Sequence, residues 1–290
     1  MTAWTAADLP SFAGRTVIVT GANSGLGEVT ARELARVGAR VILAVRDTGK
    51  GEAAAATMPG DTEVRELNLA DLSSVRRFAD GVHGDVDVLV NNAGIMAVPY
   101  ALTVDGFESQ IGTNHLGHFA LTNLLLPKIT DRVVSVSSTA HWLGRISLSD
   151  PNWQSRRYSP WAAYSQSKLA DLLFISELQR RLTAAGSPVR ALAAHPGYSH
   201  TNLQGHTGSR ASGALMAVGN RLLATSAEFG ARQTLYAVSQ DLPGDSYIGP
   251  RFNSVGRTQP VRRSRAARSA GTAAALWQLS EQLTGTRFPL

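Results

Sequence analysis

Short, mostly β-branched apolar segments recur along the 290-residue chain and alternate with longer segments of mixed polarity. Nearly continuous apolar character is typical of parallel strands that are covered on both faces of a sheet. Stretches with helical patterning, about 10–25 residues long, separate most of them and favour repeated βαβ units. The pattern therefore predicts an α/β fold with a doubly wound parallel sheet. The expected strands are residues 16–20, 40–45, 63–67, 86–90, 132–136 and 189–194.

Two segments break this rhythm. Residues 142–160 are polar, contain Pro151 and Pro160, and are expected to form a loop insertion. Residues 199–225 are rich in Gly and Ser before a helical pattern, and we expect them to fold over a site as a substrate loop. A helix is expected at residues 266–283, which leaves room for a seventh strand before it. Because no linker or repeat divides the chain, residues 1–290 are expected to form a single domain.

The amino-acid composition excludes several kinds of functional site. The chain is 43% hydrophobic, 17% charged and contains no cysteine. Disulfides, thiolate metal sites and cysteine nucleophiles are therefore excluded. Residues 1–10 carry no basic, apolar leader, and no apolar run reaches the ~20 residues that span a bilayer. We therefore expect no membrane span and a cytoplasmic protein.

The net charge is +6, and its excess lies late in the chain. This basic C-terminal segment, residues 251–290, raises the possibility of a nucleic acid or anionic lipid partner. Aromatic residues do not interleave Arg262, Arg263, Arg265 and Arg268 as a single-strand binder requires, so a solvated helix face is favoured and no nucleic acid is expected. The arginines are Arg251, Arg257, Arg262, Arg263, Arg265 and Arg268, with Arg287 near the end.

A glycine-rich turn follows the first strand and opens a helix that extends to about Val37. Its sequence is Thr-Gly-Ala-Asn-Ser-Gly-Leu-Gly over residues 20–27. Glycines permit a tight turn, and the N-terminus of the helix offers N–H groups and positive dipole to a pyrophosphate. The strand–turn–helix setting therefore predicts a dinucleotide site. Its expected contacts are Gly21, Asn23, Ser24, Gly25, Leu26 and Gly27.

Four motifs in order resemble the short-chain dehydrogenase/reductase family. The turn has the spacing G-x-x-x-G-x-G, and Asn-Asn-Ala-Gly stands at 91–94. Tyr-x-x-x-Lys follows at 164–168 and Pro-Gly at 196–197. The stretches V-S-S-x-A-H at 136–141 and A-Y-x-x-S-K-L-A at 163–170 are most similar to the retinol dehydrogenase-like branch. The resemblance implies a Rossmann-type sheet of about seven strands and hydride transfer between a nicotinamide and a carbonyl or alcohol.

Tyr164 and Lys168 form the expected catalytic pair. They are four residues apart in a helical segment and so project from one face. A phenol has a pKa of ~10, and a nearby ammonium lowers it towards the ~7 that general acid–base catalysis favours. The resemblance assigns proton transfer to Tyr164, and to Lys168 both this lowering of the pKa and a bond to the nicotinamide ribose. Lys168 is one of only three lysines, with Lys50 and Lys128, among 28 basic residues.

Two more catalytic residues follow from the resemblance. Ser138 is expected to bond the substrate oxygen, although its neighbour Ser137 remains an alternative because side chains alternate along a strand. Asn114 matches a helix asparagine that holds a water-linked proton relay to Lys168. The alternative for either residue is a purely local bond to the backbone.

The end of the second strand bears on the choice of dinucleotide. An acid there suits the ribose of NAD, whereas an arginine suits the 2′-phosphate of NADP. Val45 takes the place of the acid and Arg46 follows, so NADP(H) is expected over NAD(H). The alternative is that Arg46 pairs with Asp47, which would then be the ribose ligand. The remaining cofactor contacts implied by the resemblance are Asn68, Leu69, Asn91, Ala93, Gly94, Tyr164, Lys168, Pro196, Gly197 and Thr201.

Other functions fit the sequence less well. His115 and His118 are three apart, but no third ligand or H-E-x-x-H motif accompanies them, so no metal is expected. The S-x-x-K at 165–168 lacks the K-T-G and S-D-N partners of penicillin-binding hydrolases. A non-catalytic NADP(H)-binding sensor or scaffold would be expected to lose part of the catalytic set, which is complete here.

The expected partner is a small carbonyl or alcohol. Apolar residues within 199–225 favour an apolar substrate, although they could equally belong to a core or an interface. The resemblance also leaves a homo-oligomer possible. These residues are Leu203, Leu215, Met216, Val218, Leu222 and Leu223.

Overall fold

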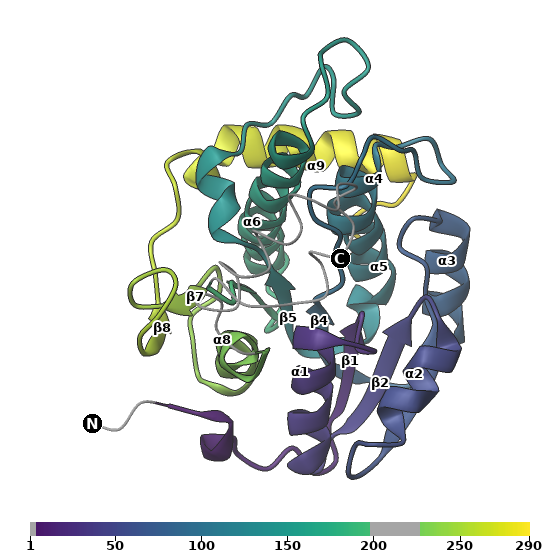
Figure 1. Cartoon of the computed structure of the whole chain (residues 1–290), viewed down its shortest axis with the longest axis vertical. Helices are drawn as coiled ribbons and strands as arrows, with labels where there is room; N and C mark the ends of the chain where they lie inside the picture. Colours follow the sequence, from purple (N-terminus) through teal and green to yellow (C-terminus); the bar gives the residue numbers. More distant parts are fainter. Residues whose placement is uncertain (1–3, 198–226) are drawn as a thin grey trace, which may run out of the picture.

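The computed structural model describes residues 4–197 and 227–290 and has an eight-stranded sheet at its centre (Figure 1). The strand order is β3-β2-β1-β4-β5-β6-β7-β8. Neighbouring strands are parallel except for β8, which runs antiparallel to β7. The strands are β1 (Thr16–Thr20), β2 (Arg40–Val45), β3 (Thr62–Glu66), β4 (Val86–Asn91), β5 (Ile129–Val136), β6 (Arg190–Ala194), β7 (Tyr247–Pro250) and β8 (Thr258–Pro260).

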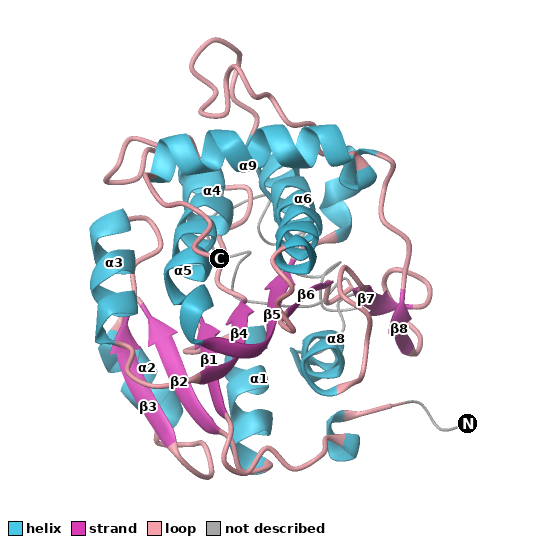
Figure 2. Cartoon of the chain, turned by 180° about the vertical axis from the view of Figure 1, so that it is seen from behind, coloured by secondary structure: helices cyan, strands magenta, loops and turns pink. Residues whose placement is uncertain are grey.

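Helices cover both faces of the sheet (Figure 2). One face carries α1 and α8, and the other carries α3, α5 and α6, with α9 packed against the outer sides of α6 and α5. The helices are α1 (Gly25–Arg36), α2 (Thr48–Ala55), α3 (Leu72–Gly81), α4 (Ser109–Ile111), α5 (Gly117–Leu125), α6 (Pro160–Ala184), α8 (Ala227–Ser239) and α9 (Ala270–Thr284).

Alternation along the strands produces this layered core. In β1, Val17 and Val19 pack with the residues of α1 and α8, whereas Ile18 between them packs with those of α3, α5 and α6. All three side chains are fully buried. Successive side chains of a strand point to opposite faces, so a continuous apolar run is what a strand between two helical layers requires. The prediction of a doubly wound parallel sheet is confirmed.

The strand count was the part of this prediction that differed. After β7 the chain turns back through residues 251–257 and pairs as β8, which gives eight strands rather than about seven. The three residues of β8, Thr-Gln-Pro, lack an apolar pattern, and Pro260 lies on the last strand of the sheet order. Proline is tolerated on such edge strands. The strand at 132–136 also begins earlier, at Ile129.

The basic C-terminal segment does not form the expected helix face, although all of its arginines except Arg263 are exposed. The helix α9 begins at Ala270, after the last of the clustered arginines. Arg263 is buried, pairs with Asp245 at 2.6 Å and donates to the Asp245 carbonyl at 2.6 Å. Its guanidinium therefore fixes the start of β7 and is not available to a polyanion.

The topology places a switch point between β1 and β4. From β1 the sheet extends to β2 on one side and to β4 on the other, and in such open sheets ligands bind outside the carboxyl ends of the strands at this switch point. The expected substrate loop, residues 199–225, lies outside the described residues. Within the described ranges, no helix combines the length and apolarity that a bilayer crossing demands.

Candidate active site

The N-terminus of α1 lies at the switch point and has no side-chain cap from the part of the chain that the structure describes. Asp47 caps α2 and Asp71 caps α3 through hydrogen bonds to first-turn N–H groups. The corresponding residue of α1, Ser24, makes no such bond. The N–H groups of the first turn of α1 are therefore available to a phosphate, as a helix N-terminus that binds dinucleotide requires.

Glycine is required in this turn because the backbone packs closely. A Cβ on Gly27 would lie 2.3 Å from the carbonyl oxygen of Gly21 and 2.4 Å from Nδ2 of Asn92. Gly21 has a φ of +66°, and a Cβ there would lie 3.0 Å from Ala93. The two glycines let the turn approach the loop after β4, so residues 21–27 and 91–94 form one wall of the site.

Thr20 joins these two motifs. Its hydroxyl oxygen accepts hydrogen bonds from the N–H groups of Asn92 and Ala93, both at 2.9 Å. Nδ2 of Asn92 donates to the Thr20 carbonyl at 2.8 Å, and Nε2 of His118 lies 2.9 Å from the Thr20 hydroxyl. Sequence reasoning missed Thr20, Asn92 and His118 in these roles. The only signal was the position of Thr20 at the end of β1.

Asn91 is a buried residue at the start of the loop after β4 and anchors it through hydrogen bonds. Its Nδ2 donates to the hydroxyl groups of Thr122, at 2.9 Å, and Ser135, at 3.4 Å. Its Oδ1 is buried without a partner among the described residues. Gly94 faces the catalytic helix, because a Cβ there would lie 3.2 Å from Oδ1 of Asn114 and 3.8 Å from Nζ of Lys168.

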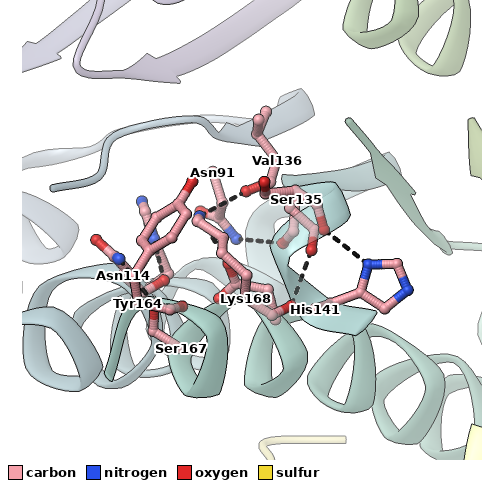
Figure 3. A network of polar contacts seen from close by, with 12 residues as sticks. Asn91, Asn114, Ser135, Val136, His141, Tyr164, Ser167 and Lys168 are labelled. Atoms are coloured by element: carbon pink, nitrogen blue, oxygen red, sulfur yellow. Dashed lines mark hydrogen bonds and ion pairs between the residues drawn. The ribbon is translucent and has the colours of Figure 1, made fainter. Parts of the chain in front are cut away.

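Tyr164 and Lys168 lie on the same face of α6, with Nζ of Lys168 5.9 Å from the centre of the Tyr164 ring (Figure 3). Both side chains are buried, at 7% and 5% exposed. Nζ donates to the carbonyl of Val136 and to Oδ2 of Asp171, both at 2.9 Å. The helical spacing thus brings the two residues together as the sequence predicts.

Burial and charge act in opposite directions on these groups. Burial alone would lower the pKa of the Lys168 ammonium, but the charge of Asp171, the charge of Tyr164 and the hydrogen bond to Asp171 together outweigh it, and the pKa lies above its usual value. Burial also raises the pKa of Asp171 to about 6, even though Lys168 opposes this rise. Lys168 is therefore protonated at neutral pH and places a positive charge beside the phenol of Tyr164.

The structure separates the two candidate serines. Ser137 is buried, and its hydroxyl donates to the carbonyl of Lys168 at 2.8 Å. Ser138 is half-buried, and its hydroxyl accepts from the N–H of Ala140 at 3.2 Å. Its hydroxyl proton has no acceptor among the described residues and can donate to a ligand. Of the two, Ser138 has the geometry for a substrate contact.

His141 holds the backbone of Ser138, a role that sequence reasoning missed. Nδ1 of His141 lies 2.7 Å from the Ser138 carbonyl, and Nε2 accepts from the N–H of Ser264 at 3.2 Å. A carbonyl can only accept and an N–H can only donate, so His141 is the neutral Nδ1–H tautomer. Burial, as the largest cause, lowers its pKa and keeps it neutral.

Asn114 lies in a π-helical turn, Gly112–Leu116, and its side chain is fully engaged. It accepts from the N–H of Ile95 and donates to the Ile95 carbonyl and to the Ser167 hydroxyl, all at 2.9 Å. Ser167 in turn donates to the Tyr164 carbonyl at 2.8 Å. Asn114 therefore ties the loop after β4 to α6 (Figure 3). Its own carbonyl lies 3.0 Å from Nδ1 of His118.

The remaining predicted cofactor residues surround the same edge of the sheet. Arg46 is exposed at the end of β2 and forms no ion pair with a described residue, whereas Asp47 pairs with Lys50 at 3.1 Å. Leu69 is buried, and Oδ1 of Asn68 accepts from the N–H of Ala70. Pro196 and Gly197 follow β6 and are half-buried. Thr201 lies outside the described residues.

The two neighbouring histidines have separate structural partners. Nε2 of His115 lies 2.9 Å from the Ser280 hydroxyl of α9, whereas His118 contacts Thr20 and Asn114. Burial lowers the pKa of His115 to about 3 and that of His118 to about 4. Over residues 4–197 and 227–290, no cluster of three or more His, Asp or Glu side chains could hold a metal ion.

Comparisons with known proteins agree with this geometry. Residues 15–211 match the family model of the short chain dehydrogenases. Human retinol dehydrogenase 13 is 45% identical over 292 residues, which cover 95% of this chain and 86% of that protein. A crystal structure of an uncharacterized protein from Mycobacterium Paratuberculosis is 76% identical, covers both chains completely and has a TM-score of 0.90.

A more distant structure shows the breadth of the fold. The NADP active-site complex of Pseudomonas aeruginosa RhlG has a TM-score of 0.63 at 22% identity and covers 82% of this chain and 94% of its own. At that identity the likeness concerns the fold alone. Together with the family match, the likeness to retinol dehydrogenase and the site geometry, it leads to one conclusion: the chain belongs to the short-chain dehydrogenase family and is an NAD(P)-dependent oxidoreductase similar to the retinol dehydrogenases.

Proposed function

We propose that this protein transfers a hydride between NADP(H) and an apolar aldehyde, ketone or alcohol of the retinoid type. The observation that carries the proposal is the place of the Tyr164–Lys168 pair: Nζ of Lys168 bonds the end of β5, two residues before Ser138, and lies beside Gly94 in the loop that packs on the turn of α1. The residues fit the dinucleotide, because the glycines let the turn pack closely and no described side chain caps the first turn of α1.

Each of the four catalytic residues has its own role in the reaction. When bound, the nicotinamide group supplies or accepts the hydride. Tyr164 donates a proton to the substrate oxygen during reduction and withdraws it during oxidation. Ser138 donates a hydrogen bond to the same oxygen and stabilises the charge that develops there. Lys168 favours the phenolate form of Tyr164 and is placed to bond ribose hydroxyls, and Asn114 keeps the loop after β4 and α6 in register.

Arg46 supports the preference for NADP(H). Its exposed guanidinium has no ion pair with a described residue and can bind a 2′-phosphate through two parallel hydrogen bonds. Asp47, the alternative ribose ligand, instead caps α2 and pairs with Lys50. The cofactor contacts proposed for Asn68, Leu69, Pro196 and Gly197 follow from their places around the same edge.

Apolar side chains beside the catalytic residues support the substrate class. Trp161, one turn before Tyr164 on α6, is 56% exposed, and its ring lies 6.0 Å from the Tyr164 ring. Trp142 and Leu143, shortly after Ser138, are 51% and 82% exposed. Large exposed apolar side chains of this kind mark ligand-binding surfaces. Human retinol dehydrogenase 13, named for a retinoid alcohol, is consistent with this assignment.

Substitution of Tyr164 by Phe tests the proposal. We expect turnover of retinal with NADPH to fall by roughly 10²–10⁴-fold, because the general acid is lost. The NADPH dissociation constant, measured by fluorescence titration, should stay close to that of the wild type. Tyr236→Phe, which alters a tyrosine packed against Trp4 on the far side of the sheet, is the matched control and should leave turnover unchanged. Equal turnover in Tyr164→Phe and the wild type would contradict the mechanism.

A further inference from the structure

The ion pair between Lys168 and Asp171 lies inside the proposed active site. The two residues are three apart on α6, and their side chains are each 6% exposed. Nζ of Lys168 donates to Oδ2 of Asp171 and to the carbonyl of Val136, both at 2.9 Å. Within the described structure, Asp171 is the acidic group that forms an ion pair with Lys168. The mechanism above gives Asp171 no role.

Among the described residues, His118 and Tyr247 are nearby titratable groups that carry no charge at neutral pH. His118 of α5 interacts electrostatically with Lys168, and burial lowers the pKa of His118 to about 4, so it is neutral. The charge of Asp171 acts on Tyr247 of β7. Burial raises the pKa of Tyr247, so Tyr247 is also neutral. Tyr164 of α6 is the remaining titratable neighbour of Lys168. The carboxylate of Asp171 therefore balances the ammonium within this pocket.

We propose that Asp171 is a positioning residue whose carboxylate keeps the Lys168 ammonium charged and fixed next to Tyr164. The role rests on the proposed function, because Lys168 serves the reaction only as a charged group at a fixed place. A buried ammonium without a counter-ion loses its proton readily, since the low dielectric penalises its charge. The Val136 carbonyl can accept one of its hydrogen atoms but carries no charge to offset that penalty.

Loss of the carboxylate has a direct chemical consequence. Neutral Lys168 would no longer stabilise the phenolate of Tyr164, so withdrawal of the substrate proton during oxidation would need a higher pH than in the wild type. The ion pair also weakens at low pH, because protonated Asp171 attracts the ammonium less strongly. Burial raises the pKa of Asp171 to about 6, so this weakening begins just below neutral pH.

The scarcity of lysine makes the proposal measurable without any turnover. Protein labelled with ¹³C at Cε of lysine has three signals, which Lys50→Arg and Lys128→Arg assign. We expect the Lys168 signal to shift with a midpoint at about pH 6 as Asp171 titrates. A separate step at about pH 4 would report His118. Lys128 donates to the carbonyls of Ala79 and Val82 and should not shift near pH 6.

Asp171→Asn tests the cause of this behaviour. The step near pH 6 should disappear, and the midpoint for deprotonation of Lys168 should move to lower pH than in the wild type. The limb of kcat for alcohol oxidation that rises with pH should move to higher pH. Glu177→Gln is the matched control, since Glu177 is a buried carboxylate on the same helix that pairs with Arg180 and Arg181. It should leave the Lys168 signal and the pH profile unchanged.

The outcomes separate this proposal from the proposed function. An unchanged deprotonation midpoint of Lys168 in Asp171→Asn would overturn the role of Asp171 and leave the oxidoreductase assignment intact. If Asp171→Asn does not fold, the deprotonation midpoint of Lys168 in the wild type decides, because a midpoint below that of an ordinary lysine would also overturn the role. The expected titration in a protein that turns over no carbonyl would support the ion pair and count against the proposed reaction.

Discussion

At the scale of single residues, Arg46 and Asp47 are neighbours in the sequence with different roles. Both are exposed at the end of β2. The Asp47 carboxylate accepts from the N–H of Lys50, which lowers its pKa, and pairs with the Lys50 ammonium. Arg46 has no such partner among the described residues. The carboxylate is thus engaged in helix capping, while the guanidinium is available to a ligand.

Arg46→Asp should therefore reverse the cofactor preference. A hydrogen bond to a charged group contributes about 1.5–3 kcal/mol, so the affinity for NADPH relative to NADH should fall by roughly 10- to 100-fold. Dissociation constants for both dinucleotides, measured by quenching of tryptophan fluorescence, check this. Lys50→Ala is the control for a lost positive charge in the same turn. An unchanged preference in Arg46→Asp would assign the 2′-phosphate to another residue.

At the scale of elements, the approach of α1 to the loop after β4 decides the shape of the site. This approach depends on Gly27, because a Cβ there would overlap the backbone of Gly21. The hydrogen bonds of Thr20 fix the other side of the same contact. The strand, the turn and the loop after β4 therefore form one rigid unit.

Gly27→Ala should disrupt that unit. Insertion of a methyl group into a packed site costs about 1–3 kcal/mol of stability, and here it also displaces the N–H groups that face the pyrophosphate. We expect a lower melting temperature together with weaker NADPH binding, by calorimetry. Gly81→Ala, at the end of α3, is the matched control, since a Cβ there meets nothing within 4 Å. If both variants bind NADPH like the wild type, the contact does not shape the site.

At the scale of the whole molecule, α9 adds a third layer outside α6 and α5 (Figure 1). Its central residue is Trp277, which is 2% exposed. The ring stacks on Phe174 at 5.7 Å and meets the edge of Phe119 at 4.9 Å, and the guanidinium of Arg181 lies 4.6 Å from its centre. One side chain thus connects α5, α6 and α9.

Trp277→Ala should lower the free energy of unfolding by about 3–5 kcal/mol, as expected for a large aromatic side chain removed from a core. Urea denaturation followed by circular dichroism measures this loss. Trp142→Ala removes a tryptophan that is 51% exposed and should cost far less. Similar losses in the two variants would show that α9 does not stabilise the molecule through Trp277.

The sequence predicted what local patterns determine. Continuous apolar runs located six strands, and the motifs identified Tyr164 and Lys168, which the structure brings together on α6. Contacts between distant segments left no local pattern. The bond from His141 to Ser264 joins residues 123 positions apart, and that from Thr20 to His118 joins residues 98 apart. Asp171 escaped notice because a lysine and an acid three apart on a helix usually form a solvated surface pair.

The bond between His141 and Ser264 also sets an order of events during translation. His141 leaves the ribosome 123 residues before the partner that completes its hydrogen bonds. Strands β1 to β6 can assemble in the meantime, since each pairs with a strand already made. The backbone of Ser138 receives its final support only when the segment after β8 docks. The growing chain therefore gains its dinucleotide-binding turn early and its complete catalytic geometry late.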